Sequence, residues 1–158
     1  MKLFLGLDPS LTSTGYCVLD EHGATLWLGR FPICKAKGAS RLFELEAHLD
    51  KALENLDGIP TLVAIEGYAF GAFAGRERLG EWGGVLRLNL FKKHIPFIEI
   101  PPTTLKKYVT GKGNAKKNQM LLSVYKKWGT SCKTDDEADS YALAQFIRTG
   151  QKLKPNKE

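Results

Sequence analysis

The stretch LFLGLDPS, residues 3–10, decides the fold of this chain. Its apolar side chains would lie on both faces of a sheet, which is typical of a strand in the middle of that sheet. Pro9 cannot continue the strand, so Asp8 is expected at its end. A carboxylate at the rim of a core is costly to bury unless a cation binds it. Asp8 is therefore a candidate metal ligand, with a simple Asp-Pro turn as the alternative.

Two further acidic sites favour the metal hypothesis. A second apolar run, LVAIEG at residues 62–67, also ends in an acidic residue. Near the C-terminus, two aspartates lie three positions apart, which places them on one face of a helix. Mg²⁺ prefers such hard oxygen ligands. We predict that the metal is bound by Asp8, Glu66, Asp136 and Asp139.

Composition indicates an ordinary globular protein. The 158 residues are 43% hydrophobic and 25% charged, which predicts one domain over residues 1–150 and a basic, disordered tail over 151–158. No apolar run approaches the roughly 18 to 20 residues of a membrane span. The first strand begins almost at once, and the three cysteines form no Cys-x-x-Cys pair. We therefore expect a cytoplasmic protein with reduced thiols and no zinc site.

The positive charge is concentrated in one third of the chain. The net charge is +6, and no acidic residue occurs from Ile100 to Thr134. A solvated helix face normally mixes both signs of charge. This stretch therefore predicts a surface for a phosphate backbone, with a merely soluble lysine-rich face as the alternative. Its lysines are Lys106, Lys107, Lys112, Lys116, Lys117, Lys126, Lys127 and Lys133.

The order of the predicted elements indicates an α/β fold. Short connections between the first three strands predict an antiparallel meander. The expected strands are 3–8, 15–20, 25–31, 61–66 and 96–100, and the expected helices are 41–55, 76–94, 103–109, 115–128 and one that starts at Thr134. Ser40, Asn114 and Thr134 are the expected helix caps. The result is a five-stranded mixed sheet, three antiparallel strands followed by parallel additions, flanked by helices.

The predicted helix 76–94 contains three glycines, Gly80, Gly83 and Gly84. Each costs about 1 kcal/mol relative to alanine inside a helix. They indicate a close approach of another backbone. That backbone belongs either to a second subunit or to the sheet of the same chain, and the sequence favours neither.

The acidic residues and the lysines together fit phosphodiester hydrolysis. Two Mg²⁺ ions about 4 Å apart can assist the attacking water and the leaving oxygen. A nearby lysine stabilises the negative charge that grows in the transition state. The segment GKGNAKK, residues 111–117, offers such a lysine. It lacks the Gly-x-x-x-x-Gly-Lys-Ser/Thr pattern of a P-loop, which excludes that interpretation.

These motifs together resemble the RuvC family of Holliday-junction resolvases, within the ribonuclease H-like superfamily. The matching segments are LGLDP at 5–9, TGY at 14–16, VAIE at 63–66, residues 102–106, Gly111-x-Gly113-x-Ala115-x-Lys117, and DEAD at 136–139 with ALA at 142–144. The resemblance implies a homodimer that nicks two strands of a four-way junction with two Mg²⁺ ions per site, or Mn²⁺ in their place. It assigns Lys117 to catalysis. It also matches Lys106 and Lys117 to family lysines that serve the active site or hold DNA. Together with the basic stretch and the loop after Glu66, the expected DNA contacts are Lys106, Lys107, Lys112, Lys116, Lys117, Tyr68, Phe70 and Phe73.

Some features depart from the family pattern. Ser10 replaces the usual glycine after Asp-Pro, and the loop after Glu66 differs from that of the bacterial enzymes. In this loop Tyr68, Phe70 and Phe73 are candidates to probe the junction, with core packing as the alternative. The short, divergent chain is most similar to phage-type members. The competing hypotheses are a ribonuclease H-like nuclease for RNA–DNA hybrids or flaps, and a non-catalytic junction-binding protein.

Overall fold

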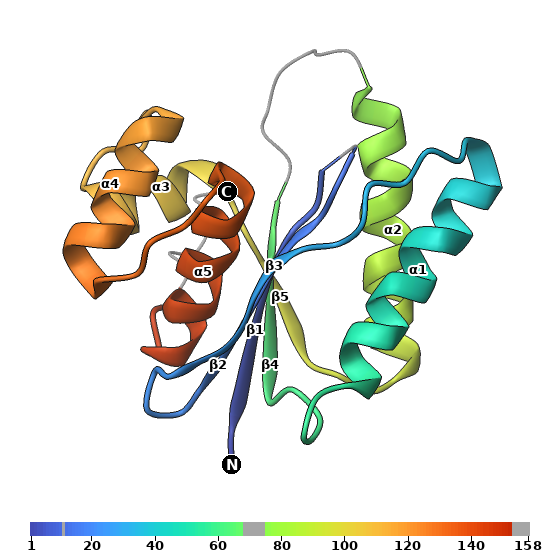
Figure 1. The fold of residues 1–158 in the computed structure, drawn as a ribbon, viewed down its shortest axis with the longest axis horizontal. Coiled ribbons are helices and arrows are strands. Elements are labelled where there is room, and N and C mark those ends of the chain that lie inside the picture. The colour runs from blue at the N-terminus through green and yellow to red at the C-terminus, as the bar shows by residue number, and fades with distance from the viewer. Residues whose placement is uncertain (11, 68–74, 153–158) are drawn as a thin grey trace, which may run out of the picture.

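A five-stranded mixed sheet forms the middle of the molecule (Figure 1). The structure is a computed structural model that describes residues 1–10, 12–67 and 75–152. The strands are β1 (Leu3–Asp8), β2 (Gly15–Asp20), β3 (Thr25–Arg30), β4 (Leu62–Glu66) and β5 (Phe97–Ile100). Their order is β3-β2-β1-β4-β5, with β1–β2 and β2–β3 antiparallel and β1–β4 and β4–β5 parallel. The predicted fold class is thereby confirmed.

Helices cover both faces of this sheet (Figure 1). They are α1 (Gly38–Glu54), α2 (Arg76–Lys92), α3 (Pro102–Thr110), α4 (Lys117–Trp128) and α5 (Asp135–Arg148). One core lies between the sheet and the α1–α2 pair, and a second core lies between the sheet and α3, α4 and α5. No helix in the described ranges is long and apolar enough to cross a bilayer.

The central strand β1 contributes to both cores because its side chains alternate between the two faces. Leu3, Leu5 and Leu7 are buried in the core under α1 and α2. Gly6 faces the other way, toward α5. Asp8 lies two residues beyond Gly6 and therefore shares its face. The apolar residues on both faces of β1 thus reflect its central position, as the sequence predicted.

Two glycines let α5 lie directly on the sheet. A Cβ atom at Gly6 would overlap the Ser140 carbonyl oxygen and lie 2.7 Å from the amide nitrogen of Ala144. A Cβ atom at Gly15 would likewise collide with the backbone carbonyl of Asp136. Because backbone atoms cannot move aside as a side chain can, both positions require glycine. They set the height of α5 above β1 and β2.

Two of the three predicted helix caps are wrong. α1 begins at Gly38 after Lys37 and not after Ser40, because its exposed first turn precedes the apolar stripe that marked the helix in the sequence. α4 begins after Lys116 and not after Asn114, because Ala115 is a buried loop residue and the Lys116 amide donates to Gln119 Oε1 at 2.8 Å.

The Thr134 cap of α5 is confirmed, since its hydroxyl accepts a hydrogen bond from the Glu137 amide at 3.2 Å. The Glu137 carboxylate completes the turn by accepting from the amide of Lys133 at 2.7 Å rather than from that of Thr134.

Candidate metal centre

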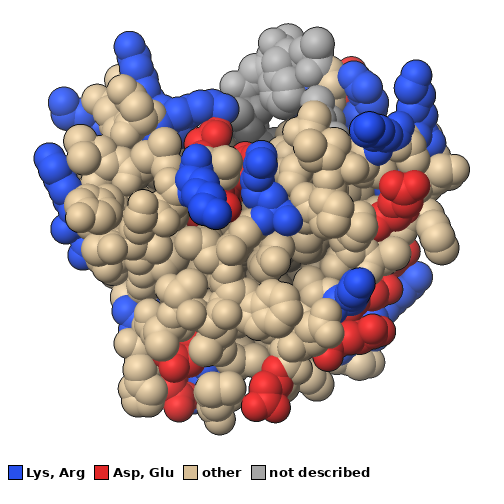
Figure 2. All heavy atoms as spheres, in the orientation of Figure 1, with Lys and Arg blue, Asp and Glu red and all other residues tan. Residues whose placement is uncertain are grey.

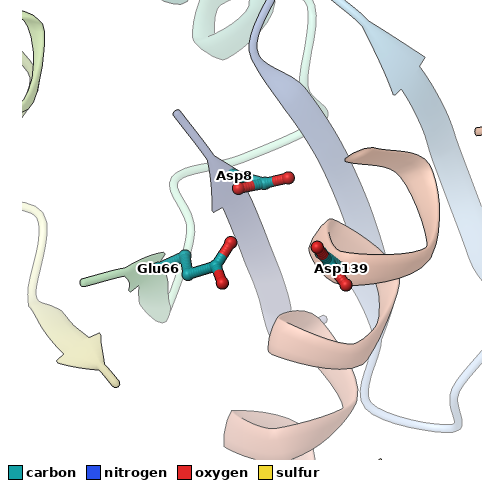
Figure 3. A group of neighbouring side chains, drawn as sticks. All are labelled: Asp8, Glu66 and Asp139. Atoms are coloured by element: carbon teal, nitrogen blue, oxygen red, sulfur yellow. The ribbon is translucent and has the colours of Figure 1, made fainter. Parts of the chain in front are cut away.

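Three carboxylates from distant parts of the chain meet at one end of the sheet. Asp8, Glu66 and Asp139 each offer an oxygen atom, and these oxygens all lie within 4.8 Å of one another. Figure 3 shows the three side chains pointing toward a common point from the end of β1, the end of β4 and the first half of α5. The sequence prediction is correct in bringing these three residues together.

The topology explains why they meet. β1 and β4 are parallel neighbours, and their register pairs Leu7 with Ile65. Asp8 and Glu66 are the next residues of the two strands and therefore lie side by side at the carboxyl edge. α5 supplies the third carboxylate because Gly6 lets it cross closely over β1. The same packing that closes the core therefore assembles the site.

The site has a strong electrostatic bias toward protonation or cation binding. Burial raises the pKa of Asp8 well above its usual range, and the charges of Glu66 and Asp139 raise it further. Burial and the charge of Glu66 raise the pKa of Asp139 to about 8. Carboxylates crowded in this way repel one another until protons or cations neutralise them.

The donor set fits a hard divalent cation. All three candidate ligands in this group are carboxylates, and neither a histidine nor a cysteine belongs to it. Mg²⁺ and Mn²⁺ prefer oxygen donors, whereas zinc and copper are usually held by nitrogen or sulfur. Burial and the repulsion between the carboxylates hold the pKa values of Asp8 and Asp139 high, and a cation at the common point would offset both.

Asp136 lies beside this group and not within it. Its carboxylate oxygen Oδ2 is 3.8 Å from Nη1 of Arg30, at the end of β3. Burial and the charge of Asp135 raise its pKa, while Arg30 and Lys117 act in the opposite direction. The charge of Asp136 in turn raises the pKa of Asp8. The structure thus gathers three of the four predicted ligands and holds the fourth at their border.

The predicted lysines lie on the α3–α4 side of the acidic group. Lys106 is half-buried on α3, and its charge lowers the pKa of Asp139. Lys117 is exposed, and its Nζ lies 2.6 Å from Asp135 Oδ2; Asp135, and less strongly Asp136 and Asp139, raise its pKa. Lys107, Lys112 and Lys116 are also exposed. In Figure 2, Lys and Arg atoms gather at the upper left, where Figure 1 places α3 and α4, next to acidic atoms.

The predicted aromatic contacts Tyr68, Phe70 and Phe73 fall outside the described residues. Sequence reasoning missed Arg30. The register of the β2–β3 hairpin could have found it, because counting outward from the turn at His22 and Gly23 places Arg30 opposite Gly15. Gly15 in turn lies opposite Asp8 across β1 and β2.

The fold and the site together define a class. A mixed five-stranded sheet in the order β3-β2-β1-β4-β5, with helices on both faces and carboxylates at the ends of its two central parallel strands, has the ribonuclease H-like fold.

Within that class, the family model of the crossover junction endodeoxyribonuclease RuvC matches residues 4–146, and the chain belongs to the RuvC family.

Similar proteins support this assignment. The crossover junction endodeoxyribonuclease RuvC of Prochlorococcus marinus (strain NATL2A) is 30% identical over 89% of this chain and 94% of its own length. That of Petrotoga mobilis is 33% identical over 90% of each. A structure of Thermus thermophilus RuvC in complex with a Holliday junction substrate matches the fold with a TM-score of 0.77 at 22% identity, over 95% of this chain and 97% of that one. These relatives are bacterial, so they do not support the expectation of a phage-type member.

Proposed function

We propose that this chain is a divalent-metal-dependent endonuclease that resolves Holliday junctions, and other branched DNA, by paired symmetric nicks. The observation that carries the proposal is the group formed by Asp8, Glu66 and Asp139 in a chain of the RuvC family. A relative with this fold is known in complex with a Holliday junction. The group lies at the surface end of the sheet, next to exposed lysines, where a DNA backbone can reach it.

Asp8, Glu66 and Asp139 would hold Mg²⁺ or Mn²⁺, and Asp136 lies close enough to complete a two-ion set. Two such ions supply an activated water and stabilise the leaving oxygen in phosphodiester hydrolysis. The chain contributes rigid placement of the ligands, since Asp8 and Glu66 end paired strands and Asp139 lies on a packed helix. Lys106, whose charge acts on Asp139, is placed to stabilise the negative charge of the transition state.

The lysines of α3, α4 and the loop between them would hold the DNA backbone. Lys107, Lys112 and Lys116 are exposed on this side, and none of them has a side-chain ion pair with another described residue. Lys117 stays linked to Asp135 in the free protein, and its catalytic role therefore requires it to exchange this partner for a phosphate. The loop residues Tyr68, Phe70 and Phe73 remain candidates for contacts with the junction.

A homodimer through α2 accompanies this function. A Cβ atom at Gly80 or Gly84 would meet nothing within 4 Å among the described residues, so the sheet of the same chain does not explain these two glycines. Leu88 and Phe91 continue the same helix face and are 51% and 72% exposed. Small residues followed by exposed large apolar ones suit a second copy of α2, and two copies would supply the two nicks.

A cleavage assay tests the function. Wild-type protein and the variant Asp8→Asn are incubated with a labelled four-way junction, a Y-fork, a linear duplex and an RNA–DNA hybrid, in Mg²⁺ and in EDTA. We expect paired nicks in the junction only with Mg²⁺, and a loss of at least about a hundredfold in rate for Asp8→Asn with junction binding retained.

Three results would contradict the proposal. Equal cleavage by Asp8→Asn would exclude the acidic group as the active site. Strong cutting of the hybrid with an intact junction would favour a general ribonuclease H-like nuclease. Junction binding without cleavage in either Mg²⁺ or Mn²⁺ would favour a non-catalytic junction-binding protein.

A further inference from the structure

Arg30 places a positive charge beside the acidic group at the β3 edge of the sheet. It is the last residue of the edge strand β3 and pairs in register with Gly15 of β2. The carbonyl of Asp136 lies against Gly15, so Arg30 and the first turn of α5 are brought to the same corner. The charge of Arg30 acts on both Asp135 and Asp136 by lowering their pKa values.

The guanidinium of Arg30 is held only loosely. Its contact with Asp136 is 3.8 Å long, beyond hydrogen-bond distance, and 40% of the Arg30 side chain is exposed. Within residues 1–10, 12–67 and 75–152, this is the only close polar contact of the side chain. A part-exposed ion pair of this length is weak. The five N–H donors of the guanidinium are therefore available to another anion, and their planar arrangement suits a phosphate.

Asp136 has a second use that competes with Arg30. It borders the three clustered carboxylates closely enough to raise the pKa of Asp8. A cation in that group would attract the Asp136 carboxylate more strongly than a guanidinium 3.8 Å away. If Asp136 turned toward such a cation, Arg30 would lose this partner and could bind another anion.

A positive contact on the β3 side would extend the path of a bound DNA backbone across this centre. The DNA contacts proposed above, Lys106, Lys112 and Lys116, lie on α3 or in the loop between α3 and α4. A phosphodiester at the common point of Asp8, Glu66 and Asp139 continues in both directions from the site. Among the described residues of the sheet, Arg30 is the cation that lies next to the acidic group at the β3 edge.

We infer that Arg30 binds a backbone phosphate of the cleaved strand on the β3 side of the metal centre, and that it exchanges Asp136 for this phosphate when a divalent cation engages Asp136. The inference rests on the proposed function. Arg30 is thus a positioning residue, because it holds the strand beside the centre and touches no reacting atom.

The test measures junction binding, independently of cleavage. Fluorescence anisotropy with a labelled four-way junction gives Kd over a series of KCl concentrations, once in EDTA and once in Ca²⁺, with intact junction verified on a gel. The proteins are wild type, Arg30→Gln, the charge-preserving Arg30→Lys and the matched control Lys2→Gln. Lys2 is exposed at the start of β1, the end of the strand opposite to Asp8.

In Ca²⁺ we expect Arg30→Gln to weaken binding about fivefold and to reduce the slope of log Kd against log salt by about 1 for each Arg30 that contacts DNA. Arg30→Lys should keep the slope, and Lys2→Gln should keep both values. In EDTA, where Asp136 retains Arg30, Arg30→Gln should differ little from wild type. Because Arg30 is part-exposed at a strand end, the variants should unfold at the wild-type temperature.

Each of the other possible outcomes would overturn a stated part of the proposal. Equal slopes for wild type and Arg30→Gln in Ca²⁺, or an equal drop for Lys2→Gln, would overturn the inference while leaving the resolvase function intact. The same loss for Arg30→Gln in EDTA as in Ca²⁺ would overturn the exchange with Asp136. If the wild type neither prefers the junction to linear duplex nor cleaves it, the proposed function fails first, and this inference fails with it.

Discussion

Asp139 belongs to a helix packed on the core, has a raised pKa and is a candidate metal ligand. The packing of α5 on the sheet holds it next to Glu66, and its pKa rises to about 8. In the folded, metal-free protein this buried carboxyl group therefore holds its proton to a higher pH than an exposed aspartate does. Metal binding must displace that proton, so metal affinity should rise with pH up to about pH 8.

The raised pKa also predicts how stability depends on pH. In the unfolded chain Asp139 loses its proton near pH 4, whereas in the folded protein it keeps it to about pH 8. The folded state thus binds more protons across this window, and the free energy of unfolding falls as pH rises from about 4 to about 8. We expect the melting temperature in EDTA to fall over this range, and Asp139→Asn to weaken the fall.

Thermal melts from pH 5 to pH 9 check this prediction. Asp57→Asn, which removes an exposed carboxylate between α1 and β4, is the matched control and should follow the wild type. Adding Mg²⁺ at pH 8 should raise the melting temperature of the wild type and leave Asp139→Asn nearly unchanged. A wild-type profile that rises with pH, in EDTA, would show that these carboxyls are not crowded as the structure has them.

For single residues, the sequence predicted the position of a site residue where that residue ends a strand. Asp8 and Glu66 could be placed because an apolar run stops at each of them. The sequence could not separate Asp136 from Asp139, because helical spacing puts both on one face but does not say which reaches the strands. Nor did it show that Lys117 is linked to Asp135, because that contact depends on how α4 and α5 pack.

At the scale of the elements, the contact of α5 with the sheet is the critical one. A methyl group at Gly6 would meet backbone atoms of Ser140 and Ala144, which cannot move unless the whole helix shifts. We expect Gly6→Ala to destabilise the fold by about 3 kcal/mol or more, because overpacking against backbone has no local relief. The same shift would move Asp139 and reduce metal binding.

Denaturant unfolding measures this effect. Gly29→Ala is the comparison, because a Cβ atom there would lie 3.5 Å from the Tyr16 hydroxyl oxygen, an ordinary van der Waals contact, and alanine is favoured over glycine inside a strand. It should be neutral, or stabilising by up to about 1 kcal/mol. If Gly6→Ala were as stable as wild type, α5 would not lie as close to β1 as described.

The elements themselves were largely predictable, because apolar periodicity and turn residues mark them. Among the helix starts, α2 begins at Arg76 and α5 after Thr134 as expected, whereas the starts of α1 and α4 were not predicted. The exposed first turn of α1 has no large apolar residue to mark it, and the loop residue Ala115 is buried like a helix residue. Patterns of apolar residues indicate which residues are buried, and the limits of a buried stretch coincide only approximately with the ends of a helix.

At the scale of the whole molecule, the proposed dimer depends on the exposed face of α2. Leu88→Glu would place a charge in an apolar contact between two copies of α2. We expect it to convert a dimer into a monomer at micromolar concentration and to abolish paired nicking while the fold remains intact. Light scattering after size-exclusion chromatography gives the mass, and circular dichroism verifies the fold.

Leu122→Glu is the matched control. Leu122 on α4 is 52% exposed, against 51% for Leu88, so both substitutions add the same charge at equally exposed leucines. We expect this variant to remain dimeric. A wild-type protein that is monomeric, or a Leu88→Glu variant that stays dimeric, would contradict an interface through α2.

The sequence left the role of the α2 glycines open between a partner subunit and the sheet of the same chain. The structure removes the second explanation for Gly80 and Gly84, because each faces open space among the described residues. Sequence alone could not decide this, because a glycine residue does not itself indicate whether its missing side chain faces another backbone or open space.

The position of α5 along the chain has a consequence for the protein during its synthesis. The strands that carry Asp8 and Glu66 leave the ribosome first, and the helix that carries Asp139 emerges only after the whole sheet and four other helices. A nascent or prematurely terminated chain therefore displays two of the three clustered carboxylates without the third. Since α5 also covers one face of the sheet, an incomplete chain exposes apolar surface. It also lacks the assembled site, so an unfinished chain cannot cut the DNA of the cell that makes it.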